Sequence, residues 1–562
     1  MTEIEFINSE IVNKSINELA NSIRAERNES DSFLDIYADK KIISRLLNHN
    51  NQIIYGRRGS GKTHLLLALA ESIIETSKKD NKAIPVYIDL RKLLPLITDA
   101  NKSKEETAVL IFQHIINNIL TSLTHRLKYI FDIQEIGHES LIETIRKDKL
   151  IDILNKLNIE FDGRKIKKLG AVEFTQEEIN KIAGSLKLSK DPNLNLEGLK
   201  ELKSLHSEQY IKYISFSEIS KFLDELLYSL NDIKIVCLLD EWSELPIDLQ
   251  PYISELLKRT FIASNYTLKI AAIPYRSNFR TTKDESTQIG LEEGGDIFPL
   301  SLDNRYIFET NKIGTRAFYN ELLVKHLKDI NEDLFSGLNE DKFINLFFAN
   351  QALAEILVAS AGIPRDFMHL FILSFNNRTN QSQRIILKNI RSATSEWYST
   401  DKKEEVEKDK SIKYLFEGIV NEIVIGKKKT HFLLPQKYSD NPYIKKLVDL
   451  RVLHIRQKGI SHKHIINRLY DVYSVDYGSY TSLDISKNTL DTDFQQLTQD
   501  LKTIEDVRDA RALSLEDDFF NKFILAIGEG IKCNNCSQTI DTKHLAYIKQ
   551  KLCNHCFEPV EK

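Results

Sequence analysis

Residues 56–63 read Gly56-Arg57-Arg58-Gly59-Ser60-Gly61-Lys62-Thr63 and match the pattern G-x-x-x-x-G-K-[ST] of a phosphate-binding loop, or P-loop. The apolar run Ile53 to Tyr55 before it predicts a strand, and the apolar stretch from His64 to about Ser77 after it predicts a buried helix. In this setting the glycines let backbone N–H groups surround the β-phosphate of a nucleotide, Lys62 faces the β- and γ-phosphates, and the Thr63 hydroxyl binds Mg²⁺. The sequence therefore predicts a site for ATP and Mg²⁺ formed by all eight residues.

A P-loop needs a second acid on a neighbouring strand to hold the metal. The apolar run from Ile233 to Leu239 predicts such a strand, and Asp240 and Glu241 follow it directly. We expect Asp240 on the Mg²⁺ side, and Glu241 as the group that orients and deprotonates the attacking water. An ordinary solvated loop start after a strand is the alternative interpretation of this acidic pair.

Three further polar residues are candidates for contact with the γ-phosphate. The run from Leu268 to Ile273 predicts another strand, and Arg276, with Asn278 as second choice, lies just beyond its end. Arg365 follows Gly362-Ile363-Pro364 at a predicted helix start, from which a guanidinium can reach phosphates. A structural contact is the alternative role of Arg276 and Asn278, and a surface arginine next to Asp366 is the alternative interpretation of Arg365.

The order of elements predicts an α/β fold with a parallel P-loop sheet, because apolar strand runs alternate with helical stretches. We divide the chain into five parts: an N-terminal helical segment (1–30), a P-loop core (31–310) with a helical insertion (about 100–230), a helical lid (311–400), a basic domain (401–490), and a C-terminal helical segment with a zinc ribbon (491–562). The stretch from Phe343 to Ser360 is expected to be helical, and Asp401 to Lys410 to be a solvated helix or linker.

The P-loop, the acids Asp240 and Glu241, and the string Gly362 to Arg365 in this order resemble the AAA+ ATPases, and most closely the branch shared by origin-recognition-type initiators and STAND switch ATPases. The resemblance covers roughly residues 30–480. It implies an ATPase with a helical lid followed by a winged helix, in which Arg365 belongs to the sensor-2 motif. The long insertion departs from the family pattern, and no arginine finger can be assigned, with Arg280 and Arg305 as the candidates.

The segment between Gly426 and Tyr470 carries eleven Lys and Arg residues against only Asp440 and Asp449, although the whole chain has a net charge of -4. With apolar residues at helical spacing and a strand-like run from Tyr470 to Val475, it is typical of a winged helix whose basic face meets DNA phosphates. Packing within the protein, or binding to partner proteins, is the alternative role.

Four of the five cysteines lie in the last thirty residues, as Cys533-x-x-Cys536 and Cys553-x-x-Cys556 separated by sixteen residues. This spacing predicts a structural Zn²⁺ site that is closed by four thiolates. His544 and His555 are expected to be bystanders, and Cys237 to be a small buried apolar residue. A ribbon of this kind binds nucleic acid or protein about equally often.

The net charge of -4 gives no chain-wide positive field for nucleic-acid binding, so any such activity must be local. No apolar run approaches the roughly 18 residues that cross a bilayer. We expect a cytoplasmic, homo-oligomeric ATPase that acts on DNA. Resemblance implies a bacterial phage-defence or mobile-element setting with a separate effector protein. The alternative is a nucleotide-dependent signalling scaffold that acts through protein contacts with little or no ATP turnover.

Overall fold

The structure is a computed structural model of the 562-residue chain. It describes residues 3–24, 32–77, 83–97, 103–132, 216–229, 233–264, 266–282, 288–303, 305–308, 310–349, 351–379, 383–427, 429–461, 468–481 and 513–560. Most of the predicted insertion lies outside these residues, apart from its two ends. Among the described residues, no helix is long and apolar enough to span a membrane.

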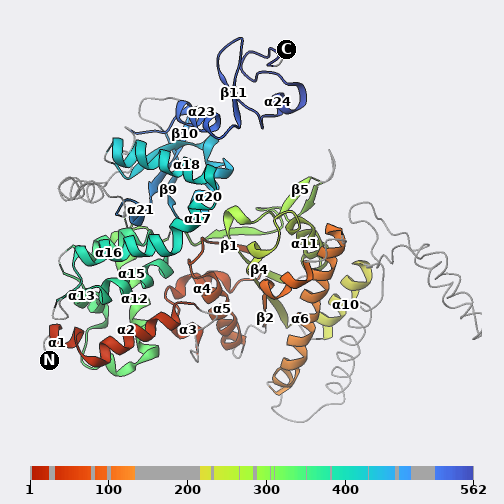
Figure 1. Ribbon diagram of the computed structural model, residues 1–562. Helices are drawn as coiled ribbons and strands as arrows, with labels where there is room; N and C mark the ends of the chain where they lie inside the picture. The colour runs from red at the N-terminus through yellow and green to blue at the C-terminus, as the bar shows by residue number, and fades with distance from the viewer. Residues whose placement is uncertain are drawn as a thin grey trace, which may run out of the picture. The chain divides into compact units, whose positions relative to one another are not determined.

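The chain divides into two compact units. The first contains residues 1–30, 57–60 and 303–562, and the second contains residues 31–56 and 61–302. The division passes through the P-loop, so that Arg57 to Ser60 group with the C-terminal half of the chain. Figure 1 labels the helices and strands of both units.

The second unit is built on a five-stranded parallel sheet with the order β2-β3-β4-β1-β7. Its strands are β1 (Gln52–Tyr55), β2 (Ala83–Asp89), β3 (Lys234–Asp240), β4 (Thr267–Ala272) and β7 (Phe298–Ser301). The three apolar runs of the sequence form β1, β3 and β4, which confirms the predicted α/β class. Because the strands are parallel, their carboxyl ends lie at one edge, and Asp89 is in register with Asp240.

Helices cover both faces of this sheet, since successive side chains of a strand point to opposite sides. Cys237 and Leu239 of β3 belong to the apolar cluster that includes α6 (Lys104–Asp132), α10 (Phe216–Ser229) and α11 (Gln250–Leu257). Val236 and Leu238 belong to the cluster with α4 (Lys40–Leu46) and α5 (Lys62–Ser77). Cys237 is thus the buried apolar residue that the sequence predicts. The short helix α3 (Phe33–Ile36) contacts α5, and β5 (Arg280–Thr282) pairs with β6 (Gln288–Gly290).

The first unit begins with a helical layer. Its helices are α1 (Glu3–Ile7), α2 (Glu10–Ser22), α12 (Lys312–Ile330), α13 (Phe343–Phe347), α14 (Ala352–Ala359), α15 (Pro364–Asn376) and α16 (Leu387–Trp397). The N-terminal helix α2 packs on α12 and α15, so the first residues of the chain belong to this layer. The stretch from Phe343 to Ser360 is largely helical, as predicted, but it is divided into α13 and α14, because the backbone around Phe348 bonds to Ile385.

A three-stranded antiparallel sheet with the order β8-β10-β9 follows the helical layer. We name residues 410–475 the β8–β10 domain; it contains α18 (Lys410–Ile419), β8 (His431–Pro435), α19 (Gln436–Ser439), α20 (Pro442–Asp449), β9 (Leu453–Ser461) and β10 (Leu469–Val475). The short helix α17 (Lys403–Glu407) precedes it, and α21 (Tyr477–Thr481) follows it. The solvated segment predicted from Asp401 to Lys410 needs correction, because Lys402 and Val406 are buried.

The C-terminal segment returns to the β8–β10 domain. Leu433 of β8 exchanges backbone hydrogen bonds with Leu513 and Leu515, at N···O distances of 2.8 and 3.0 Å. Helix α23 (Asp517–Ala526) comes next, and β11 (Gly530–Lys532), β12 (Thr539–Asp541) and α24 (Leu545–Gln550) complete the chain. We name residues 529–560 the cysteine module.

Candidate nucleotide site and cysteine centre

The P-loop joins β1 to α5. Gly59 and Gly61 both have φ of 88°, a left-handed conformation that glycine adopts without strain. The Gly56 N–H donates to the Ala272 carbonyl of β4 at 3.1 Å, and the Lys62 ammonium donates to the Gly56 carbonyl at 2.8 Å. The ammonium group of Lys62 is therefore held against the first residue of the P-loop. Lys62 is also the first residue of α5.

Asp240 ends β3 and is fully buried. Its carboxylate accepts from the Tyr87 hydroxyl at 2.9 Å and from the Glu241 N–H at 2.8 Å, and it is hydrogen-bonded to the Thr63 hydroxyl. Burial raises the pKa of Asp240, while the bonds from Thr63 and Tyr87 and the Lys62 charge oppose that rise. Two of the oxygens that the sequence assigns to Mg²⁺ thus meet beside Lys62.

Glu241 follows in a left-handed conformation with φ of 57°. Burial, and then the charge of Asp240, raise the pKa of Glu241, whereas Lys62 and Arg91 lower it. The Arg91 guanidinium lies 3.5 Å from the Glu241 carboxylate and 2.8 Å from that of Asp89. Sequence reasoning missed Arg91, although its place two residues after the end of β2, beside the acid strand, was a usable signal.

The loop that carries Arg276 and Asn278 follows β4, and the side chains of Ser243 and Gln250 hold its backbone by hydrogen bonds. The Ile273 N–H donates to the Ser243 hydroxyl at 2.6 Å. The Gln250 amide donates to the Arg276 carbonyl at 3.0 Å and accepts from the Asn278 N–H at 2.7 Å. This loop is therefore positioned by the segment after Glu241, a link that the sequence alone did not indicate.

Arg57 uses its polar groups within the protein. Its guanidinium bonds to the Asp303 carboxylate at 3.3 Å, the His454 ring at 2.9 Å and the Ala361 carbonyl at 3.0 Å, and its N–H donates to Asp303 at 2.7 Å. The sequence assigns Arg57 to the nucleotide. In the structure its side chain also links the P-loop to residues far along the chain.

Arg365 lies against Gly59. Its N–H donates to the Gly59 carbonyl at 3.2 Å, and a Cβ at Gly59 would stand 2.9 Å from the Arg365 Cβ and Nε atoms. Burial lowers the pKa of Arg365 to about 10, and its buried Nε has no hydrogen-bond partner among the described residues. A partly buried guanidinium whose Nε is a spare donor is suited to an anion.

The two arginine-finger candidates are engaged locally. Arg280 pairs with Glu292 at 3.1 Å, and Arg305 lies 5.8 Å from the Tyr306 ring centroid. Neither contact selects one of them for a role toward a neighbouring subunit.

The positive charge counted between Gly426 and Tyr470 is only partly accessible. Arg451 and Arg456 are buried, so the expectation that they form a basic surface is wrong. Lys445 pairs with Asp440 at 2.9 Å. The exposed lysines of this segment in the described chain include Lys427, Lys429, Lys446 and Lys458, while Lys428 and Lys463 lie outside the described residues.

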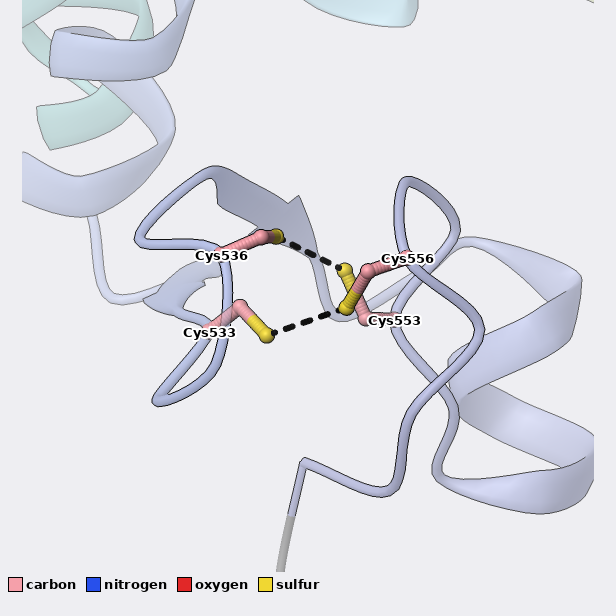
Figure 2. Close-up of side chains that lie close together, drawn as sticks. All are labelled: Cys533, Cys536, Cys553 and Cys556. Atoms are coloured by element: carbon pink, nitrogen blue, oxygen red, sulfur yellow. Dashed lines mark hydrogen bonds between the residues drawn. The ribbon is translucent and has the colours of Figure 1, made fainter.

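The four C-terminal cysteines converge, as Figure 2 shows. Their sulfurs all lie within 4.8 Å of one another, and the pairs Cys533–Cys556 and Cys536–Cys553 are both 3.7 Å apart. Disulfide sulfurs would be about 2.05 Å apart, whereas a tetrahedron with Zn–S bonds of about 2.3 Å has edges of about 3.8 Å. The geometry therefore fits a small zinc ribbon.

Two similar turns present these thiols. In each, the residue after the second cysteine, Ser537 or Phe557, is left-handed and its N–H donates to the carbonyl of the first cysteine. The N–H groups of Cys536 and Asn535 lower the pKa of Cys533, which favours the thiolate at that position. The N–H of Gln538 acts in the same direction on the neighbouring Cys536, but burial and its bonds to the other thiols raise the pKa of Cys536. Among the described residues, the histidines do not join this group; the His544 ring instead accepts from the Ala546 N–H at the start of α24.

Purified protein should contain one Zn²⁺ per chain by elemental analysis. Cys533→Ser and Cys556→Ser should each lose the metal and expose the cysteine module to protease, because binding on the order of 10 kcal/mol supports a module with little apolar core. Cys237→Ala serves as the control and should keep the metal, since Cys237 lies in β3. A metal-free wild-type protein with four readily alkylated C-terminal thiols would contradict the assignment.

Comparison with known proteins identifies the family. A sequence profile described as ORC-CDC6-like matches residues 18–439, more than half of the chain. Among solved structures, the chain is similar to the Orc1 protein of Aeropyrum pernix, solved in complex with DNA, with 12% identity, a TM-score of 0.27, and coverage of 83% of this chain and 98% of that chain. No curated protein matches the sequence. The chain belongs to the ORC-CDC6-like family.

Proposed function

We propose that this chain is an AAA+ ATPase that binds ATP with Mg²⁺, hydrolyses it, and uses the nucleotide state to control assembly and conformation on DNA. The observation that carries the proposal is the meeting of the Thr63 hydroxyl with the Asp240 carboxylate beside the Lys62 ammonium. Hydroxyl and carboxylate oxygens suit Mg²⁺, and the ammonium suits phosphate. Membership of the ORC-CDC6-like family supports the same reading.

Each site residue takes one task in this proposal. Lys62 and the P-loop N–H groups hold the phosphates, Thr63 and Asp240 hold Mg²⁺, and Glu241 acts as the base for water. When bound, Mg²⁺ neutralises charge on the phosphates. Arg365 at Gly59 and Arg276 beyond β4 are the proposed γ-phosphate sensors.

Lys62→Ala should weaken ATP binding by about 10- to 100-fold, because it removes a charged contact to the phosphates. Glu241→Gln should keep ATP affinity while lowering turnover by about 10²- to 10⁴-fold, the usual contribution of a general base. Nucleotide titration and phosphate release measure the two steps separately. Unchanged ATP affinity in Lys62→Ala would contradict the P-loop assignment. Undiminished turnover in Glu241→Gln would contradict the assignment of Glu241 as the general base.

The pH dependence of turnover tests the contact between Arg91 and Glu241. A base works only while ionised, and Arg91 lowers the pKa of Glu241, so Arg91→Gln should move the acid limb of the kcat profile to higher pH. Arg91→Lys keeps the charge and should leave the limb near its wild-type position. An unmoved limb in Arg91→Gln would show that the arginine does not act on the base.

The β8–β10 domain is the proposed DNA-binding winged helix. Three antiparallel strands with α18, α19 and α20 are the elements of such a domain, and exposed lysines remain at Lys427, Lys429, Lys446 and Lys458. The cysteine module is a proposed second contact to DNA or protein. The proposed setting is cytoplasmic, within a bacterial phage-defence or mobile-element system that includes a separate effector protein, and the active form is a homo-oligomer.

Replacing Lys427, Lys428 and Lys429 together with Glu should weaken binding to duplexes of any sequence, because phosphate contacts carry no base code. The plot of log affinity against log salt should also become shallower, by about 0.9 for each phosphate that the variant no longer neutralises. Lys14→Glu, an exposed change in α2, is the control and should leave both quantities unchanged. Salt-insensitive binding, or no binding in either nucleotide state, would remove DNA from the proposal.

One observation favours the second candidate, a signalling scaffold with little ATP turnover. Arg91 occupies the Glu241 carboxylate at 3.5 Å, and a base that is paired with a cation is a weaker base. The scaffold function predicts that the wild-type protein binds ATP tightly but hydrolyses it no faster than the Glu241→Gln variant. It also predicts that the wild-type protein does not bind DNA.

A further inference from the structure

The start of α23 lies on the basic side of the β8–β10 domain. Lys437 of α19 pairs with Asp517 at 2.6 Å. Arg468, directly before β10, pairs with Asp517 at 3.0 Å and with Glu516 at 2.9 Å. Two of the cations that the sequence assigns to a DNA-binding segment are therefore matched by two acids of the C-terminal segment.

Aromatic rings hold the same segment in place. Tyr438 stacks on Phe520 with ring centroids 3.7 Å apart, and its hydroxyl donates to Asp517 at 2.9 Å. Tyr443 of α20 packs edge-on against Phe523 at 5.2 Å, and its hydroxyl bonds to Glu529 at the start of the cysteine module. The C-terminal segment thus covers side chains of both α19 and α20.

The ion pair between Lys437 and Asp517 is exposed enough for its partners to exchange. The Lys437 and Asp517 side chains are 51% and 48% exposed, and an exposed ion pair shifts an equilibrium by at most about fivefold. Ion pairs in water are also weakened by salt. A DNA phosphate offers the same acceptor chemistry as a carboxylate, so it competes for the same two donors.

We propose that the segment Leu513–Ala526, through Glu516 and Asp517, is an internal competitor of DNA that latches the β8–β10 domain in a low-affinity state. The inference rests on the proposed DNA binding by this domain. In the latched state Lys437 and Arg468 are neutralised by the chain itself. DNA can bind to Lys437 and Arg468 only after the acidic start of α23 has moved away. The apparent affinity for DNA is therefore the affinity of the unlatched state multiplied by the fraction of protein that is unlatched.

Asp517→Asn, compared with Asp518→Asn, tests the latch in the full-length protein. Both changes remove one negative charge from the first turn of α23. Asp518, however, is exposed and makes no ion pair with a described residue, whereas Asp517 accepts from Lys437, Tyr438 and Arg468. Because Asp517 forms two such ion pairs, affinity for a fluorescent duplex at low salt should rise about 3- to 10-fold in Asp517→Asn. In Asp518→Asn it should stay within about twofold of the wild-type value.

The other outcomes separate the latch from the proposed function. If none of the three proteins binds DNA, the proposed function fails and the latch falls with it. If all three bind equally, DNA binding stands and the latch is overturned. If both variants bind DNA more tightly by the same factor, the cause is a general charge effect and the latch is overturned. Weaker DNA binding by Asp517→Asn also overturns the latch, because the segment would then contribute to DNA binding. Zinc content should equal the wild-type value in both variants, which checks that the cysteine module is intact.

Discussion

A buried network of charged and polar side chains connects the P-loop residue Arg57 to the helical layer and the β8–β10 domain of the first unit. The Arg57 guanidinium meets the His454 Nδ1 atom at 2.9 Å, and the His454 Nε2 atom lies 3.0 Å from Asp476. Lys402 continues the chain, 2.7 Å from Asp476 and 3.5 Å from Asp366. Burial lowers the pKa of His454 to about 3, so the ring is neutral; because Arg57 can only donate, Nδ1 is the acceptor and the Nε2–H donates to Asp476.

This arrangement explains why four P-loop residues group with the C-terminal half of the chain. Burial alone would raise the pKa of Asp366, but Arg451 and Lys402 hold it below its usual value. Removing one partner from a buried ion pair typically costs about 3 to 5 kcal/mol, because the other charge is left without compensation. The helical layer, the β8–β10 domain and Arg57 to Ser60 are therefore joined by charges that depend on each other.

The same network shows where sequence reasoning succeeds and where it stops. Apolar runs predict β1, β3 and β4, because burial of a parallel strand leaves a continuous signal. Cysteine spacing predicts the thiolate cluster, because two short Cys-x-x-Cys turns supply all four metal ligands and few contacts with distant residues are needed to form the site. Arg451 was counted among the eleven basic residues of the predicted DNA-binding segment because its partners, Asp366 and Asp401, are remote in sequence. Arg91 and the break between α13 and α14 were missed for the same reason, since each depends on a contact with a distant segment.

Charges matched within the chain also limit how the proposed DNA binding can work. Of the eleven basic residues between Gly426 and Tyr470, Arg451 and Arg456 are buried, and Lys437 and Arg468 are paired with the C-terminal acids. Few phosphate contacts per chain give weak binding at physiological salt. Several chains on one duplex would bind with the avidity of linked sites, and DNA would in turn stabilise the assembled form. Because such a coupling is reciprocal, a nucleotide that favoured assembly would also favour DNA binding, and the proposed function requires a coupling of this form.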